Sequence, residues 1–154
     1  MAEPVARAEM MIRKPAAEVY EAFANPAITS RFWFTGGSGR LEPGAKVRWE
    51  WAMYGFSVEV EVKAVEPGRR ILVTWSGYGY PTPIEWIFKP LADGHTLVTV
   101  TNSGFKGKAA EKTKMALDST EGFTFTLAGA KIWLEHGIEP NFVRDRHPGG
   151  LPSE

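Results

Sequence analysis

The sequence predicts an α+β protein in which a curved antiparallel sheet wraps around a long C-terminal helix. Between about residues 45 and 102, apolar and polar residues alternate, which predicts consecutive strands, and tight turns between them make neighbouring strands antiparallel. A helical apolar stripe follows these strands, and short helical segments precede them. A sheet with one apolar face needs a cover, and the last helix is the longest candidate.

The N-terminal part is expected to form one strand and two short helices. Residues 5–12 mix β-branched and charged side chains, and Pro15 then ends the strand and begins a helix. An apolar stripe continues this helix to Pro26, where a second short helix runs to about Phe34. The glycine-rich residues 36–39 are expected to form a loop, either a mobile lid or a helix end packed on the sheet.

The first central hairpin places tryptophans on one face. Residues 45–51 alternate strictly, which is typical of a half-buried strand. With a tight turn at residues 54–55, Trp51 would pair with Val58 and Trp49 with the next inward residue, Val60. Each predicted pair agrees in polarity, so the hairpin would share one apolar face.

Two further hairpins extend the sheet. With Pro67-Gly68 as a turn, Val62 faces Val73 and Val60 faces Trp75. The last hairpin turns at Ala92-Asp93-Gly94, with Gly94 in the left-handed conformation of a bulge. This register places Val98 and Val100 beside Ile84, Trp86 and Phe88. The sheet would therefore have six strands.

The closing helix is predicted to run from a capping box at Asp118 and Glu121 to Gly137, which is about five turns. The lysine-rich residues 106–114 before it are expected to be a solvated flexible connection. Residues 1–137 would form a single domain, and residues 138–154 a C-terminal extension packed on it or trailing from it.

Composition narrows the function. Lys+Arg and Asp+Glu both number 18, so no net field would draw the protein to nucleic acid. The chain has no cysteine, and its three histidines have no metal-ligand spacing, so neither a metal nor another cofactor is expected. No apolar segment is long enough for membrane insertion, and no signal peptide is visible, which favours a cytoplasmic location.

Aromatic residues make up 12% of the chain, and many fall on the predicted inward face. They could pack as an ordinary core, or they could line a pocket of about 300–1,000 Å³ for an apolar or aromatic ligand. The predicted lining residues are Trp33, Trp49, Trp51, Val60, Trp75, Trp86, Phe88, Val100, Asn102, Phe123, Leu127 and Ala130. The predicted rim consists of Phe34, Tyr54, Tyr78 and Tyr80.

A second set of polar residues alternates with the tryptophans: Arg48, Glu50, Glu59, Glu61 and Lys63. Their parity predicts a solvated outer face rather than paired catalytic carboxylates, and Glu85 is placed there too. No nucleophile motif is present, and no catalytic residue is assigned.

The order of elements resembles the START-like helix-grip superfamily, also called SRPBCC or Bet v-like. The resemblance is carried by Val19, Trp33-Phe34, the tryptophan-bearing strands, Thr96 to Phe105, and the spacing of Gly122, Phe123, Leu127 and Leu134. Within the superfamily, the chain is most similar to the activators of the heat-shock-chaperone ATPase. Phe123 stands where that family usually has Trp, and Asn102 stands where many members have His.

The resemblance implies a binding domain and, in some relatives, an aromatase, cyclase or hydrolase-like enzyme. Our leading hypothesis is a binder of a small hydrophobic or amphipathic molecule whose polar end is oriented by Asn102 and Trp N–H groups. An enzyme would need an inward titratable group, and Tyr54, Tyr78 and Glu85 are the candidates. A third hypothesis is a module that contacts a chaperone. Oligomeric state is left open, with a homodimer among the alternatives.

Overall fold

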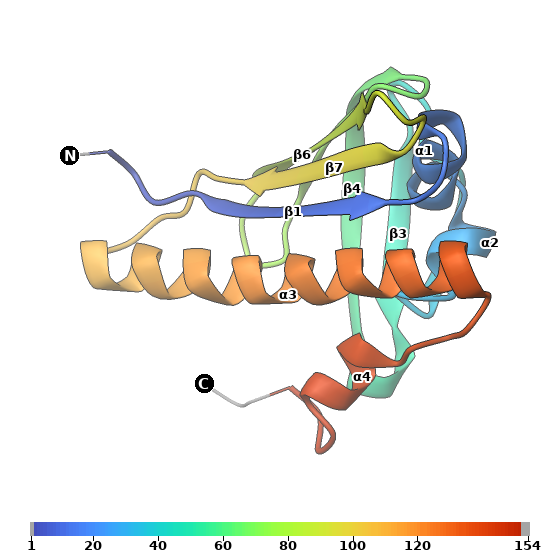
Figure 1. The fold of residues 1–154 in the computed structure, drawn as a ribbon. Helices are drawn as coiled ribbons and strands as arrows, with labels where there is room; N and C mark the ends of the chain where they lie inside the picture. The colour runs from blue at the N-terminus through green and yellow to red at the C-terminus, as the bar shows by residue number, and fades with distance from the viewer. Residues whose placement is uncertain (1, 152–154) are drawn as a thin grey trace.

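The computed structural model describes residues 2–151 and shows a strongly curled sheet packed against one long helix (Figure 1). Chain order is β1 (Ala6–Ile12), α1 (Ala16–Ala24), α2 (Pro26–Thr29), β2 (Gly36–Gly37), β3 (Lys46–Trp51), a 3₁₀ turn (Ala52–Tyr54), β4 (Phe56–Glu66), β5 (Arg70–Trp75), β6 (Thr82–Pro90), β7 (Thr96–Asn102), α3 (Ala109–His136) and α4 (Phe142–Arg146). The predicted α+β helix-grip architecture is confirmed.

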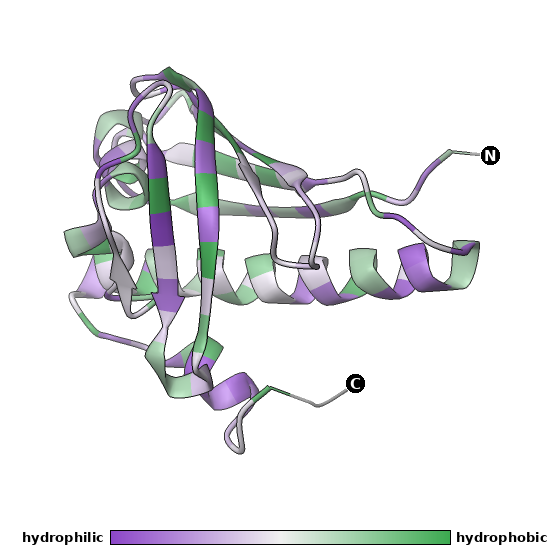
Figure 2. Ribbon diagram, turned by 180° about the vertical axis from the view of Figure 1, so that it is seen from behind, coloured by the Kyte–Doolittle hydropathy of each residue, from purple (hydrophilic) through white to green (hydrophobic). Residues whose placement is uncertain are grey.

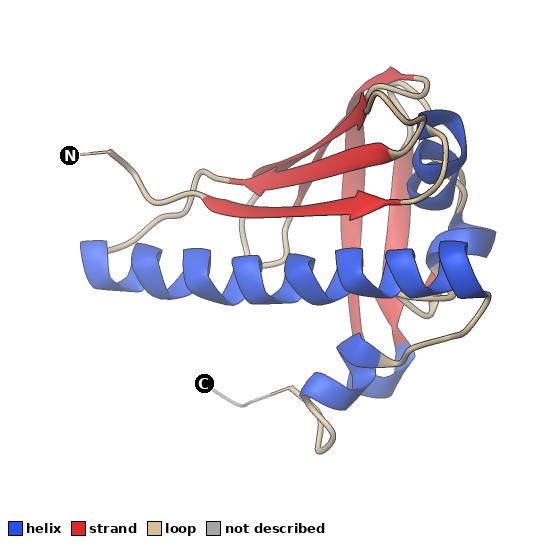
Figure 3. Ribbon diagram, in the orientation of Figure 1, coloured by secondary structure: helices blue, strands red, loops and turns tan. Residues whose placement is uncertain are grey.

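The sheet is antiparallel throughout, in the order β1-β7-β6-β5-β4-β3-β2. Strands β1 and β7 run along α3, whereas β3 and β4 cross behind it (Figure 1). Helices α1 and α2 close one end of the curl (Figure 3). The space that the curled sheet encloses is therefore bounded by α3 on one side and by these helices at its end.

The seven strands exceed the expected six because Gly36–Gly37 forms a short edge strand on β3. The expectation of a loop was therefore wrong for Gly36 and Gly37. A Cβ on Gly37 would lie 2.8 Å from Cβ of Pro26, so glycine allows the backbone to approach α2 closely. Glycine has low strand propensity, which hides such a strand from sequence patterns.

The β3–β4 register differs from the prediction by two residues. Trp51 pairs with Phe56, and Trp49 pairs with Val58, because the chain turns through the 3₁₀ segment and Gly55. A shift of two preserves side-chain parity, so the tryptophans still face inward and Arg48 still faces outward. Figure 2 shows the resulting alternation of polar and apolar residues along both strands.

The other two predicted registers are confirmed. Val62 pairs with Val73, although the turn contains three residues and a bulge between Val62 and Ala64 restores the expected pairing. Trp86 pairs with Val100 across a loop in which Gly94 has a φ of +84°. The apolar faces of β4 to β7 therefore converge on the same interior.

Helix α3 begins at Ala109, well before the predicted Asp118. Its first turn is capped by the Glu111 carboxylate, which accepts a hydrogen bond of 3.1 Å from the backbone N–H of Lys108. The expectation of a flexible connection over residues 106–114 was wrong. These turns bury few apolar side chains, mainly Ala116 beside Phe105 and Ala6, so their sequence shows little helical periodicity.

The described part of the C-terminal extension, up to residue 151, folds back over α3. The hydroxyl of Tyr54 donates to the carbonyl of Val143 on α4, and Arg31 pairs with Glu139 at 2.9 Å. Arg146 pairs with Glu121 of α3. Residues 152–154, the last of the predicted extension, lie outside the described residues.

A buried polar network fastens α3 to the sheet. The amide nitrogen of Asn102 donates to Oγ1 of Thr82 at 3.0 Å and to the carbonyl of Pro83 at 2.8 Å, and its oxygen accepts from Oγ of Ser119 at 2.9 Å. Asn102 is fully buried. The amide therefore ties β6, β7 and α3 together.

We predict that Asn102→Ala lowers the free energy of unfolding by roughly 2–3 kcal/mol, because buried hydroxyls lose their partners. Urea denaturation monitored by tryptophan fluorescence measures the loss. Thr101→Ala, on the outward side of the same strand, is the control and should change stability by less than about 0.5 kcal/mol. Equal effects of the two substitutions would contradict the structural role assigned to Asn102.

Candidate functional site

The predicted inward aromatic residues meet in one cluster around Trp33. Its ring centroid lies 4.9 Å from that of Trp49, 5.6 Å from that of Phe123 and 6.1 Å from that of Trp86. These spacings are those of aromatic rings in contact. The rings therefore fill much of the space between the sheet and α3.

Most of the predicted lining residues lie in this packed core. Each of the following is at most 2% exposed and borders neither of the two pockets described below: Trp49, Val60, Trp86, Phe88, Val100, Leu127 and Ala130. Trp51 is 5% exposed, and it also borders neither pocket. The hydrogen-bonding N–H groups of Asn102 are used within the protein, so they are not free to orient a ligand.

The four predicted rim residues have different environments. Phe34 is buried and stacks on Trp49, with ring centroids 5.4 Å apart. Tyr54 holds the C-terminal segment, and the hydroxyl of Tyr80 accepts from the backbone N–H of Lys106 at 2.8 Å. Tyr78 is the rim residue that borders the pocket between the sheet and α3.

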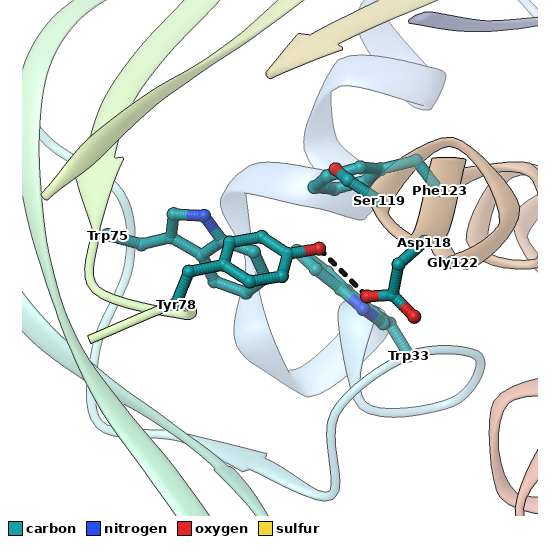
Figure 4. A pocket seen from close by; sticks show the side chains of 7 residues that line it. All are labelled: Trp33, Trp75, Tyr78, Asp118, Ser119, Gly122 and Phe123. Carbon is teal, nitrogen blue, oxygen red and sulfur yellow. Dashed lines mark hydrogen bonds between the residues drawn. The ribbon is translucent and has the colours of Figure 1, made fainter. Parts of the chain in front are cut away.

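This pocket has a volume of about 120 Å³ and opens to solvent beside α3. It is lined by Trp33, Trp75, Tyr78, Asp118, Ser119, Gly122 and Phe123 (Figure 4). The volume is well below the expected 300–1,000 Å³, because the clustered rings occupy the deeper interior. It is close to the roughly 150 Å³ of a cavity that accepts benzene.

Three lining residues, Asp118, Ser119 and Gly122, were not assigned from the sequence, because only large or apolar residues were selected from the helix that was expected to begin at Asp118. Positions 118, 119, 122 and 123 recur at the spacing of one helix face. This spacing alone, within the predicted helix, would have placed Ser119 and Gly122 beside Phe123.

Tyr78 and Asp118 form the polar mouth of the pocket. The Tyr78 hydroxyl donates to Oδ2 of Asp118 at 2.9 Å, across the opening between the sheet side and α3 (Figure 4). Burial, and secondarily the neighbouring Asp118 carboxylate, raises the pKa of Tyr78 far above its usual value of 10.0. The phenol is therefore neutral at physiological pH and acts as a hydrogen-bond donor.

Gly122 leaves one wall of the pocket without a side chain. A Cβ there would have no neighbour within 4 Å, so packing does not require glycine at this helical position. Gly129 is different, because its Cβ would lie 3.2 Å from both Cβ and the carbonyl oxygen of Phe32. Gly129 therefore allows α3 to contact Phe32 closely and leaves no open space there.

Two buried indole nitrogens, Nε1 of Trp75 and Nε1 of Trp86, have no hydrogen-bond partner within residues 2–151. Such a donor costs free energy unless an acceptor reaches it. Trp86 lies in the core, whereas Trp75 lines the pocket with other atoms of its ring, since its Nε1 is shielded from solvent.

A second pocket, of about 170 Å³, lies between the segment after α2 and the C-terminal segment. Trp33 borders both pockets, and charged residues including Arg31, Glu139 and Arg144 border this one. The described residues contain no cluster of three His, Cys, Asp or Glu that could hold a metal ion. No helix within residues 2–151 has the length and apolar character of a membrane span.

We predict opposite effects of alanine at the two glycines of α3. Gly122→Ala should raise the free energy of unfolding by about 0.5–1 kcal/mol, because alanine loses less backbone entropy and meets open space. Gly129→Ala should lower it by roughly 1 kcal/mol, because its Cβ crowds Phe32. Urea denaturation of both variants tests this, and a gain at Gly129 would refute the packing argument.

The environment of Tyr78 predicts a loss of stability at high pH. A pKa that is higher in the folded chain means stability that is full below the unfolded value of about 10 and declines as the pH rises above it. Between about pH 10 and 12, the wild type should therefore lose more stability than Tyr78→Phe. Parallel declines in urea titrations at these pH values would show that Tyr78 does not contribute.

Several solved structures have the same fold. A Staphylococcus saprophyticus protein, SSP2350, is 29% identical over 88% of this chain and 94% of its own, with a TM-score of 0.76. DynU16, from the dynemicin biosynthetic locus, is 24% identical over 90% of this chain and 49% of its own, with a TM-score of 0.77. The Aha1 dimer from Colwellia psychrerythraea is 20% identical over 89% of this chain and 98% of its own, with a TM-score of 0.71.

No curated protein matches the chain significantly. One family model, described as activator of Hsp90 ATPase homolog 1-like protein, matches residues 13–129, which begin directly after β1 and include the whole ring cluster and most of α3. The chain therefore belongs to the activator of Hsp90 ATPase homolog 1-like family within the START-like superfamily.

Proposed function

We propose that this protein binds a small amphipathic molecule, inserting a compact apolar group into the pocket beside α3 and leaving the remainder outside. The observation that carries the proposal is a solvent-open pocket with aromatic walls and a polar mouth. Apolar walls supply affinity, and a few polar groups fix orientation.

One further feature supports a bound molecule. Gly122 keeps a wall of the pocket open at the cost of helix propensity. The volume of about 120 Å³ suits a group of about six non-hydrogen atoms, the size of benzene, and is too small for a lipid chain. The similar fold of DynU16, a protein of a biosynthetic locus, is compatible with small-molecule binding.

The enzyme hypothesis has less support than ligand binding, because only one of its three candidate titratable residues borders the pocket. Glu85 lies on the outer face of the sheet, where it accepts from Arg70 at 2.7 Å, and Tyr54 is engaged with the C-terminal segment. Tyr78 does reach the pocket, but its raised pKa makes it a donor rather than a base. The chaperone partner, the homodimer, the cytoplasmic location and the boundary near residue 137 remain predictions.

Blocking the open wall tests the proposal. Gly122→Leu should project a side chain into the pocket and weaken binding of small aromatic ligands such as indole or benzyl alcohol at least about tenfold, which corresponds to about 1.4 kcal/mol. Intrinsic tryptophan fluorescence titrations and ligand-induced shifts in melting temperature measure this.

Gly122→Ala is the matched control and should retain binding, because its methyl group fills little of the pocket. Absence of any fluorescence or melting shift with a panel of small aromatic and amphipathic compounds would overturn the proposed function. Equal binding by wild type and Gly122→Leu would place the ligand elsewhere.

A further inference from the structure

We propose that the group held in this pocket is an alkylated ammonium ion, such as the trimethylammonium group of a choline-like molecule. This inference rests on the proposed function and specifies the ligand of the same site. It arises from the juxtaposition of an aromatic wall with one unpaired carboxylate.

The aromatic wall is continuous and comes from three parts of the fold. Trp33 follows α2, Trp75 ends β5, and Phe123 lies on α3, with ring centroids between 5.6 and 6.3 Å apart. Tyr78 adds a fourth ring at the mouth. The faces of aromatic rings carry negative potential, and a cation within about 6 Å of a ring centroid is attracted to them.

Asp118 supplies the formal negative charge. Its side chain is exposed at the mouth, and within residues 2–151 no lysine, arginine or histidine forms an ion pair with it. Its Oδ2 accepts from Tyr78, which fixes the carboxylate toward the pocket. Arg146, the cation whose charge acts on Asp118 from nearby, is itself paired with Glu121.

The polar groups of the pocket favour an alkylated ammonium over a primary amine or guanidinium. Those cations need several hydrogen-bond acceptors. Here the acceptors are the Asp118 carboxylate at the mouth and the lone pairs of the Ser119 and Tyr78 hydroxyls, whereas the rest of the lining is mainly aromatic and offers no acceptor. A trimethylammonium group needs no hydrogen-bond acceptor, and its methyl groups can contact the aromatic rings directly.

Size and charge agree with this choice. Trimethylammonium on a carbon chain has about the bulk of benzene, which suits a pocket of about 120 Å³. The Asp118 carboxylate would repel carboxylates and phosphates placed at the mouth. A neutral group of the same shape would gain the contact with the rings but not the attraction of the charge.

The decisive comparison uses choline and 3,3-dimethylbutan-1-ol, in which a carbon atom replaces the nitrogen without changing the shape. We expect choline to bind the full chain at least about tenfold more tightly in NMR or calorimetric titrations. Choline affinity should fall as salt concentration rises, whereas affinity for the neutral alcohol should not.

Asp118→Asn should remove most of the preference for choline while retaining the alcohol, because asparagine still accepts from Tyr78. Glu59→Gln, which removes the same charge from the outer face of the sheet, should leave the preference unchanged. Phe123→Leu should reduce the preference while keeping an apolar wall, which provides a second variant if the first is poorly folded.

Equal affinities for choline and the alcohol would overturn the ammonium inference and leave the proposed apolar site intact. Binding of neither compound would also overturn it, and the separate panel of aromatic ligands would then decide the proposed function. A choline preference that survives in Asp118→Asn and Phe123→Leu would show that the cation binds elsewhere.

Discussion

The packing of the Trp33 indole between the sheet and α3 is the interaction on which the interior depends. Its ring contacts those of Trp49 and Trp86 on the sheet side and that of Phe123 on the helix side. Trp33 is positioned by α2, which is tied to α1 by a hydrogen bond of 2.5 Å from the Thr29 hydroxyl to the carbonyl of Ala22. Because this one side chain spans the enclosed space, the curled sheet holds a filled core and not a large cavity.

The same residue determines where space remains. Trp33 borders the pocket beside α3 and the pocket beneath the C-terminal segment, so it separates them. The early turns of α3 then provide the polar side of the first pocket, since Asp118 and Ser119 lie on the helix face that carries Phe123. Because α3 begins at Ala109, before Asp118, the Asp118 carboxylate is held on a regular helix beside the aromatic residues of the pocket.

Much of the fold follows from the period of two in the strands. Alternation between Lys46 and Trp51 correctly assigns the inward face, and the two-residue error in the β3–β4 register leaves that assignment intact. The edge strand at Gly36–Gly37 could not be predicted, because its backbone pairing depends on contacts between distant segments. The start of α3 was missed because its first turns carry little apolar periodicity.

The site was less predictable than the fold, because it too depends on contacts between segments that are distant in the sequence. Alternation shows which residues face inward, but the space left among them depends on how large rings from separate elements interlock. The structure brings Trp33, Trp75 and Phe123 together at one pocket, whereas Trp49 and Trp86 lie deeper, in the packed core. Asn102 illustrates the same limit, because its partners Thr82 and Ser119 come from elements distant in sequence.

A crystal structure with tetramethylarsonium, an ion shaped like tetramethylammonium, would test the central claim most directly. Arsenic scatters anomalously, so its position can be assigned without interpreting weak density. The account predicts one anomalous peak against the rings of Trp33, Trp75 and Phe123, within reach of the Asp118 carboxylate. A peak at a different surface, or none at a concentration that saturates binding in solution, would contradict it.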